Sequence, residues 1–81
     1  MTREETYRVL AALIGEEIGA GPVELAPETV LADLRGWDSV AIAGVLLAVE
    51  SQFGIDVDRD RLENLVTAKD LADLAELGSR R

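Results

Sequence analysis

The sequence predicts an all-α fold: a small antiparallel bundle of three to four helices with a long loop between the first and second helices. Only 4% of the 81 residues are aromatic, so the core must be built from Leu, Val, Ile and Ala, a mixture that favours helices. Apolar residues also recur at helical spacing between residues that start and stop helices. A chain of this length is expected to form a single domain, residues 1–81, with one modest core.

The first helix is expected from about Thr2 to Ile18. Thr2 and Glu5 have the spacing of a capping box, in which each side chain bonds the other residue's backbone N–H. The run Gly19-Ala20-Gly21-Pro22 ends the helix. The apolar residues at helical spacing are Tyr7, Leu10, Ala11, Ile14 and Ile18.

Residues 19–37 form a long connection that contains both prolines of the chain. Loops of this length are uncommon in small domains and are often functional. Pro27-Glu28-Thr29 is expected to begin a short turn through Leu34. The apolar side chains expected to pack on the core are Val23, Leu25, Val30, Leu31 and Leu34.

The second helix is expected to start at Asp38 or Ser39, to run to Phe53 and to end at Gly54. Residues 40–49 carry no polar side chain, and a helix that is apolar all round is normally buried. A small bundle cannot easily bury every side. Either one side stays partly exposed as a docking surface, or the third helix and the loop cover it. That side is formed by Ala41, Gly44, Val45 and Ala48.

The last part of the chain is expected to contain the third of the longer helices. Ile55 and Val57 lie in a short extended link, and residues 58–66 form a short helix or turn. Thr67 and Asp70 resemble a capping box at the start of the last helix. The tail, about residues 78–81, is expected to be frayed.

The composition of the chain excludes several kinds of partner and several kinds of side-chain chemistry. Eight basic residues stand against sixteen acidic ones, a net charge of −8 that repels nucleic acids and anionic membranes and favours a basic partner surface. The chain has no Cys and no His, which excludes disulfides, His-assisted nucleophiles and the usual zinc sites. We therefore expect no catalytic residue and no enzyme activity. The N-terminus is unlike a signal peptide, and residues 40–49 are too short to span a bilayer, so we expect a cytoplasmic protein.

An acidic run after the second helix has the spacing of a calcium loop. Asp56, Asp58 and Asp60 match the first ligands of an EF-hand. That loop needs Gly at its sixth position and Glu at its twelfth, where this chain has Arg61 and Thr67. We therefore predict no strong metal site and a solvated acidic turn, with weak binding of divalent ions left open.

Asp38 and Ser39 stand at the start of the apolar helix, and both residue types favour capping. Asp38 can cap the helix while Ser39 takes the first helical position, beside unpaired backbone N–H groups. Because a helix N-terminus favours negative charge, this position suits a serine that carries a phosphodiester. It does not suit a serine nucleophile, since no His is available as a base and Lys69 is the only lysine. The alternative is that both residues only cap the helix.

Three segments, in this order and spacing, resemble the acyl carrier protein family. They are Leu34-Arg35-Gly36-Trp37-Asp38-Ser39-Val40, Glu50-Ser51-Gln52-Phe53-Gly54-Ile55-Asp56-Val57 and Thr67-Ala68-Lys69-Asp70-Leu71-Ala72-Asp73-Leu74. The resemblance covers essentially the whole chain. It implies that Ser39 is joined through a phosphodiester to 4′-phosphopantetheine from coenzyme A, with Asp38 and Trp37 at the cofactor site. The thiol of that arm would carry acyl groups as thioesters, which accounts for a chain without Cys.

The resemblance also implies partners. They are a phosphopantetheinyl transferase, an acyl- or aminoacyl-loading enzyme and a downstream synthase or transferase. Carriers of fatty acid synthesis usually have acidic residues along the second helix, whereas this chain has small and apolar ones. Trp37 before Asp-Ser resembles stand-alone carriers of polyketide, nonribosomal peptide or hybrid biosynthesis. We therefore expect a monomer whose partners, neither nucleic acid nor membrane, contact Val40, Ala43, Leu47 and Glu50.

Several alternatives stay open at this point. The cargo can be acyl, malonyl-type or aminoacyl, and an aminoacyl or peptidyl carrier uses the same arm. In a different class, the chain is an unmodified helical module that binds a partner helix in an apolar groove. A calcium sensor is a third hypothesis, which the residues at the EF-hand positions disfavour. Trp37 can also serve only to hold the loop against the start of the helix.

Overall fold

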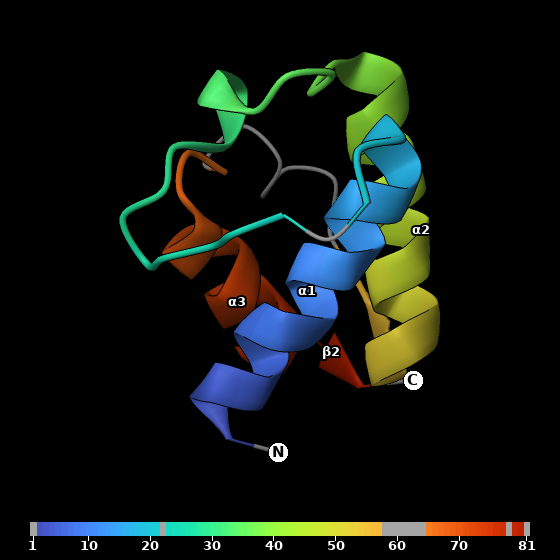
Figure 1. Ribbon diagram of the computed structural model, residues 1–81. Helices are drawn as coiled ribbons and strands as arrows, with labels where there is room; N and C mark the ends of the chain where they lie inside the picture. The colour runs from blue at the N-terminus through green and yellow to red at the C-terminus, as the bar shows by residue number, and fades with distance from the viewer. Residues whose placement is uncertain (1, 22, 58–64, 78, 81) are drawn as a thin grey trace.

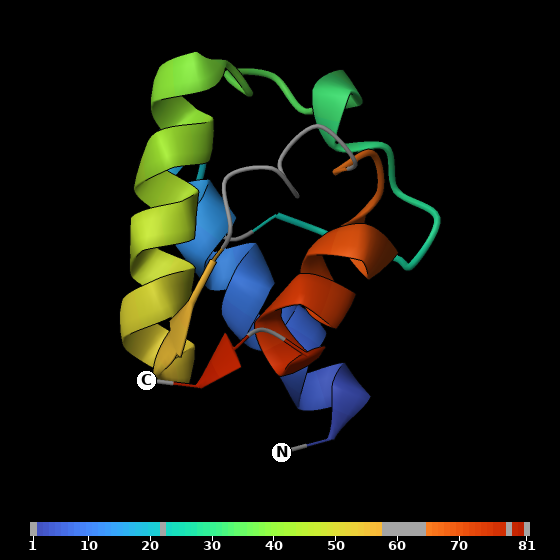
Figure 2. The ribbon, with the colours of Figure 1, turned by 180° about the vertical axis from the view of Figure 1, so that it is seen from behind.

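The computed structural model describes residues 2–21, 23–57, 65–77 and 79–80, and it confirms the predicted all-α bundle. Over these residues the α-helices are α1 (Arg3–Ile18), α2 (Ser39–Phe53) and α3 (Ala68–Leu77). α1 and α2 run antiparallel, side by side, and α3 packs against both (Figures 1 and 2). The long connection between α1 and α2 contains one 3₁₀ turn, η1 (Leu31–Asp33). Among the described residues, no helix has both the length and the apolar character needed to cross a membrane.

The ends of α1 follow the predicted signals. The Thr2 hydroxyl accepts a hydrogen bond from the Glu5 N–H at 3.1 Å, and the Glu5 carboxylate accepts one from the Thr2 N–H at 3.4 Å. This reciprocal pair is the predicted capping box. At the other end Gly19 has φ 71°, in the left-handed region where glycine carries no steric penalty. Local chemistry therefore fixes both ends of this helix.

The side of α2 for which exposure and coverage were both left open is largely buried. Ala41 and Val45 lie in the interior, and Gly44 and Ala48 are half-buried. α1 packs closely against this side: a Cβ atom built on Gly44 would overlap the Glu17 carboxylate. The docking interpretation of this side is therefore wrong, and α1 is the element that covers it. The exposed apolar side of α2 is a different one, which carries Val40 and Leu47.

The long connection fastens the start of α3. The carbonyl oxygens of Thr29 and Pro27 accept hydrogen bonds from the N–H groups of Ala68 and Lys69, at 2.8 and 3.0 Å. The N–H of Leu31, in η1, donates to the Val66 carbonyl at 2.9 Å. The N–H groups of Ala68 and Lys69 and the carbonyl of Val66, all at the start of α3, are thus hydrogen-bonded to a segment distant in sequence.

Most of the predicted loop side chains pack inward. Leu31 is fully buried, and Val23, Leu25 and Leu34 are half-buried against the core. Val30 is exposed, which corrects the prediction for this residue; its backbone instead forms a bridge with Thr67. The predicted capping box of α3 is present, since Asp70 and Thr67 bond each other's backbone N–H.

The core is aliphatic, as the composition predicts. It is built from all three helices together with η1 and Ile55. Thr6 is its one buried polar side chain among the described residues, and its hydroxyl donates to the Thr2 carbonyl at 3.2 Å. The buried core residues are Leu10, Ile14, Leu31, Val45, Leu46, Val49, Ile55, Ala68, Leu71, Ala72, Leu74 and Ala75.

A short antiparallel pairing follows the helices at the carboxyl end. Strand β1 (Ile55–Asp56) pairs with β2 (Ser79–Arg80), with Ile55 opposite Arg80. The expectation of a frayed tail is therefore wrong for residues 79–80, because their backbone is paired with that of 55–56. Gly78, Arg81 and most of the predicted acidic turn, residues 58–64, lie outside the described residues.

An ion-pair network joins the start of α1 to α3. The Arg3 guanidinium lies 2.7 Å from an Asp73 carboxylate oxygen and 3.0 Å from a Glu76 oxygen. Lys69 bonds the second oxygen of Asp73 at 3.0 Å. The hydrogen bonds from Lys69 and from Arg3 lower the pKa of Asp73 below that of an ordinary Asp. The charged form of Asp73 is thus favoured by folding.

We expect the stabilising contribution of this network to be lost in acid, so that the free energy of unfolding falls. A carboxyl whose pKa is lower in the folded state stabilises the fold above its unfolded pKa, about 3.9 for Asp, and that contribution is lost as the pH falls through the lower folded-state pKa. In the Asp73→Asn variant the free energy of unfolding should therefore fall less steeply as the pH drops below about 4. Urea unfolding across this pH range measures it, with Glu28→Gln, an exposed loop carboxylate, as control. Equal slopes for the Asp73→Asn variant and the parent protein would contradict the prediction.

A candidate attachment site at the start of α2

Asp38 is the residue that begins α2. Its side-chain Oδ1 accepts a hydrogen bond from the Ala41 N–H at 2.8 Å, and its carbonyl accepts one from the Ile42 N–H at 2.9 Å. Its backbone is extended, as an N-cap requires. Because Asp38 takes the cap, Ser39 becomes the first residue of the helix, as the sequence predicts.

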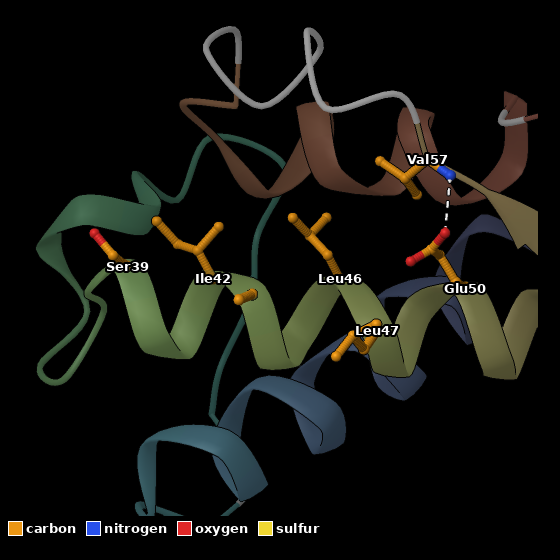
Figure 3. A pocket seen from close by; sticks show the side chains of 7 residues that line it. Ser39, Ile42, Leu46, Leu47, Glu50 and Val57 are labelled. Carbon is orange, nitrogen blue, oxygen red and sulfur yellow. Dashed lines mark hydrogen bonds between the residues drawn. The ribbon is translucent and has the colours of Figure 1, made fainter.

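The Ser39 side chain is left available by this arrangement. It is exposed, and its hydroxyl makes no hydrogen bond to any other residue that the structure describes. Figure 3 shows it at one end of α2, pointing away from the helix axis. It lies on the first turn, where the helix dipole and unpaired N–H groups favour negative charge. A covalently attached anionic group fits this position without displacing an internal contact.

Gly36 and Trp37, the two residues before Asp38, fix the position of the loop that leads into α2. Gly36 has φ 91°, and a Cβ on it would lie 3.1 Å from the Ile18 Cβ at the end of α1. Glycine adopts that backbone conformation without steric penalty, and it leaves room for the close approach of Ile18. The Trp37 N–H donates to the Leu34 carbonyl at 3.1 Å, and its half-buried ring packs against the core. Trp37 thus holds the loop against the fold.

A half-open pocket of about 520 Å³ begins at Ser39 and extends along α2. In Figure 3, Ile42 and Leu46 project toward Val57, with Ser39 at one end of the row. The wall is largely apolar, and it offers a sheltered surface beside the exposed hydroxyl. The described residues that line it are Ser39, Ile42, Ala43, Leu46, Leu47, Glu50 and Val57.

Glu50 closes the far end of this pocket. Its Oε2 accepts a hydrogen bond from the Val57 N–H at 3.2 Å, which ties the chain after β1 back to α2 (Figure 3). From the sequence, Glu50 was predicted only as a partner contact. A single charged residue near the end of an otherwise uncharged helix was the available signal for an internal role, but its backbone partner could not be inferred from the sequence.

Unlike the half-buried Glu50, the other candidate partner contacts are exposed. Val40 and Leu47 are 81% and 69% exposed, and Ala43 is exposed between them. The structure thus brings Ser39 and this apolar strip onto one helix. Within the described ranges no group of three or more His, Cys, Asp or Glu side chains is arranged to hold a metal ion, and no described side chain lies hydrogen-bonded to Ser39 as a base. The site can carry a group, but its side chains do not form a nucleophile and base pair.

Comparison with known proteins agrees with this arrangement. The family model described as the phosphopantetheine attachment site matches residues 8–75. An acyl carrier protein of Thermotoga maritima is 31% identical over 75 residues, 93% of each chain, and one of Acidothermus cellulolyticus is 32% identical over 73 residues, 90% of this chain and 87% of the relative.

Among solved structures, the solution structure of a holo acyl carrier protein from Geobacter metallireducens superimposes with a TM-score of 0.79 at 25% identity. It covers 90% of this chain and 84% of that one. The family match extends over most of the sequence and includes the whole of α2. The fold and the family model agree. This chain therefore belongs to the phosphopantetheine-binding acyl carrier protein family, whose members are carriers and not enzymes.

Proposed function

We propose that Ser39 is the attachment point of the 4′-phosphopantetheine arm. The observation that carries the proposal is the exposed Ser39 hydroxyl, which has no hydrogen-bond partner among the described residues and lies at the mouth of an apolar pocket. A phosphodiester on this oxygen would lie beside the first N–H groups of α2, where negative charge is stabilised. The arm supplies a terminal thiol that holds acyl groups as thioesters.

The neighbouring residues act by positioning Ser39. Asp38 fixes where α2 begins, so that Ser39 takes the first turn with its hydroxyl outward. Gly36 and Trp37 fix the loop before it against α1 and the core. In this proposal Trp37 and Asp38 form the rigid base of the cofactor site, and partner enzymes supply the catalytic groups.

The pocket supports an acyl cargo. Ile42, Leu46 and Val57 offer apolar surface next to the attachment point, and burial of an alkyl group there is favourable. An aminoacyl or peptidyl cargo on the same arm is the alternative. The mass spectrum of the carrier isolated from its native host identifies the cargo directly and separates the two.

We further propose that this carrier domain serves specialised biosynthesis of polyketide or nonribosomal peptide type. The support is the composition of α2, where Glu50 is the only charged residue and its carboxylate is engaged by Val57. The partners are a phosphopantetheinyl transferase, a loading enzyme and a downstream synthase or transferase. Val40, Ala43 and Leu47 would meet apolar surfaces of these partners.

The proposal is tested by modification with coenzyme A. Incubation with a phosphopantetheinyl transferase of broad specificity should raise the intact mass of the protein by one phosphopantetheine. No mass gain, under conditions that fully modify a known carrier protein, would overturn the proposal and favour an unmodified helical interaction module.

A further inference from the structure

We propose that the surface on which the transferase docks spans two helices, and that its acidic contact is Glu17 of α1 lying over Gly44 of α2. The proposal builds on the assignment of Ser39 above. It commits to one occupant: a transferase surface that presents an apolar side chain next to an arginine or a lysine. We call the exposed residues Val40, Ala43 and Leu47 the apolar strip.

The apolar strip supplies the shape of this surface. Its members are spaced by three and four residues, so they lie on one side of α2 directly after Ser39. Val40 and Leu47 are among the most exposed large apolar side chains that the structure describes. Val40 follows Ser39 directly, so an enzyme at the Ser39 hydroxyl lies close to the start of the strip. Covering the strip removes apolar surface from water and favours the complex.

Gly44 brings a carboxylate to the edge of the strip. It lies between Ala43 and Leu47 in sequence, on the side that faces α1, and the Glu17 carboxylate occupies the space where a Cβ atom would be. Any larger residue at position 44 would displace that carboxylate. Glu17 is exposed and makes no ion pair to another described residue, so its charge is available to a partner. A carboxylate from α1 thus lies over Gly44, where α2 itself has no acidic residue.

The surrounding charge favours a basic partner. α2 contains no basic residue, and the last turn of α1 has none. Arg3 and Lys69 are engaged at the opposite end of α1, in the network with Asp73. Arg35, in the loop before α2, is the described basic residue nearest to Ser39 in the sequence. Within α2 and the last turn of α1 no basic side chain offsets the charge of Glu17, which complements an arginine or lysine placed beside an apolar contact.

The experiment measures the kinetics of modification by the transferase as a function of carrier concentration. Glu17→Ala should raise the KM for the carrier about two- to fivefold with kcat unchanged, the size expected for one exposed ion pair. Glu16→Ala, which removes the neighbouring exposed acid of α1, is the matched control and should leave KM unchanged. The double variant Glu17→Ala/Gly44→Glu moves the carboxylate onto α2 and should restore KM.

The apolar part is tested in the same assay. Leu47→Ser should raise KM, whereas Leu77→Ser, which changes a leucine of similar exposure on α3, should not. Equal KM values for Glu17→Ala and Glu16→Ala, or no recovery in the double variant, would overturn the role of Glu17. That failure is distinct from failure of the proposed function, in which the unchanged protein itself would take up no phosphopantetheine.

Discussion

Ser39→Ala is expected to take up no phosphopantetheine when it is incubated with coenzyme A and the transferase. The substitution removes the oxygen that would form the phosphodiester, so the expected effect is a complete loss of the mass gain. The fold should be unaffected, because Asp38 provides the helix cap and Ser39 makes no hydrogen bond to another described residue. Intact-protein mass spectrometry measures the result.

Ser51→Ala is the matched control, since Ser51 is an exposed serine near the other end of α2. It should be modified as completely as the parent protein. Thermal unfolding of all three proteins should give the same midpoint. A full mass gain in the Ser39→Ala variant would show that the arm is attached elsewhere, and the site assignment would be wrong.

Leu71→Ala is expected to cause the largest loss of stability among conservative truncations of α3. Leu71 is fully buried in the core, and truncation of a buried leucine to alanine costs about 2–5 kcal/mol of unfolding free energy. A domain of this size has roughly 4–12 kcal/mol in total. The variant should therefore unfold at a much lower urea concentration, with an unchanged dependence on urea.

Leu77→Ala provides the comparison within the same helix. Leu77 is 72% exposed, so its truncation should change the unfolding free energy by no more than about 0.5 kcal/mol. Equal losses in the two variants would mean that α3 does not pack as described. Circular dichroism during urea unfolding gives both values.

The boundaries of the helices could be predicted because their signals are local. Thr2 with Glu5, Asp38 and the left-handed glycines Gly19 and Gly54 each act on backbone groups within a few residues. The position of Ser39 on the first turn follows from Asp38 in the same way. These interactions depend little on the rest of the fold, so the sequence alone carries them.

The buried side of α2 could not be predicted, for a different reason. Residues 40–49 are apolar on every side, so the pattern contains no contrast to orient the helix. The orientation is set by packing against α1, which buries Ala41 and Val45 and which the pattern within α2 does not encode. The bond between Glu50 and Val57 and the pairing of 79–80 with 55–56 likewise join segments whose contact no local signal announces.

The hydrogen bonds from the long connection to the start of α3 have a consequence for the order of folding. α1 and α2 carry their own start and stop signals, so their turns can form from local contacts. The bonds from Ala68 to Thr29 and from Lys69 to Pro27 close a loop that encloses all of α2, and they gain nothing until that loop is closed. Docking of α3 is therefore expected after the transition state, so that truncation of its buried Leu71 should mainly speed unfolding and leave the folding rate nearly unchanged.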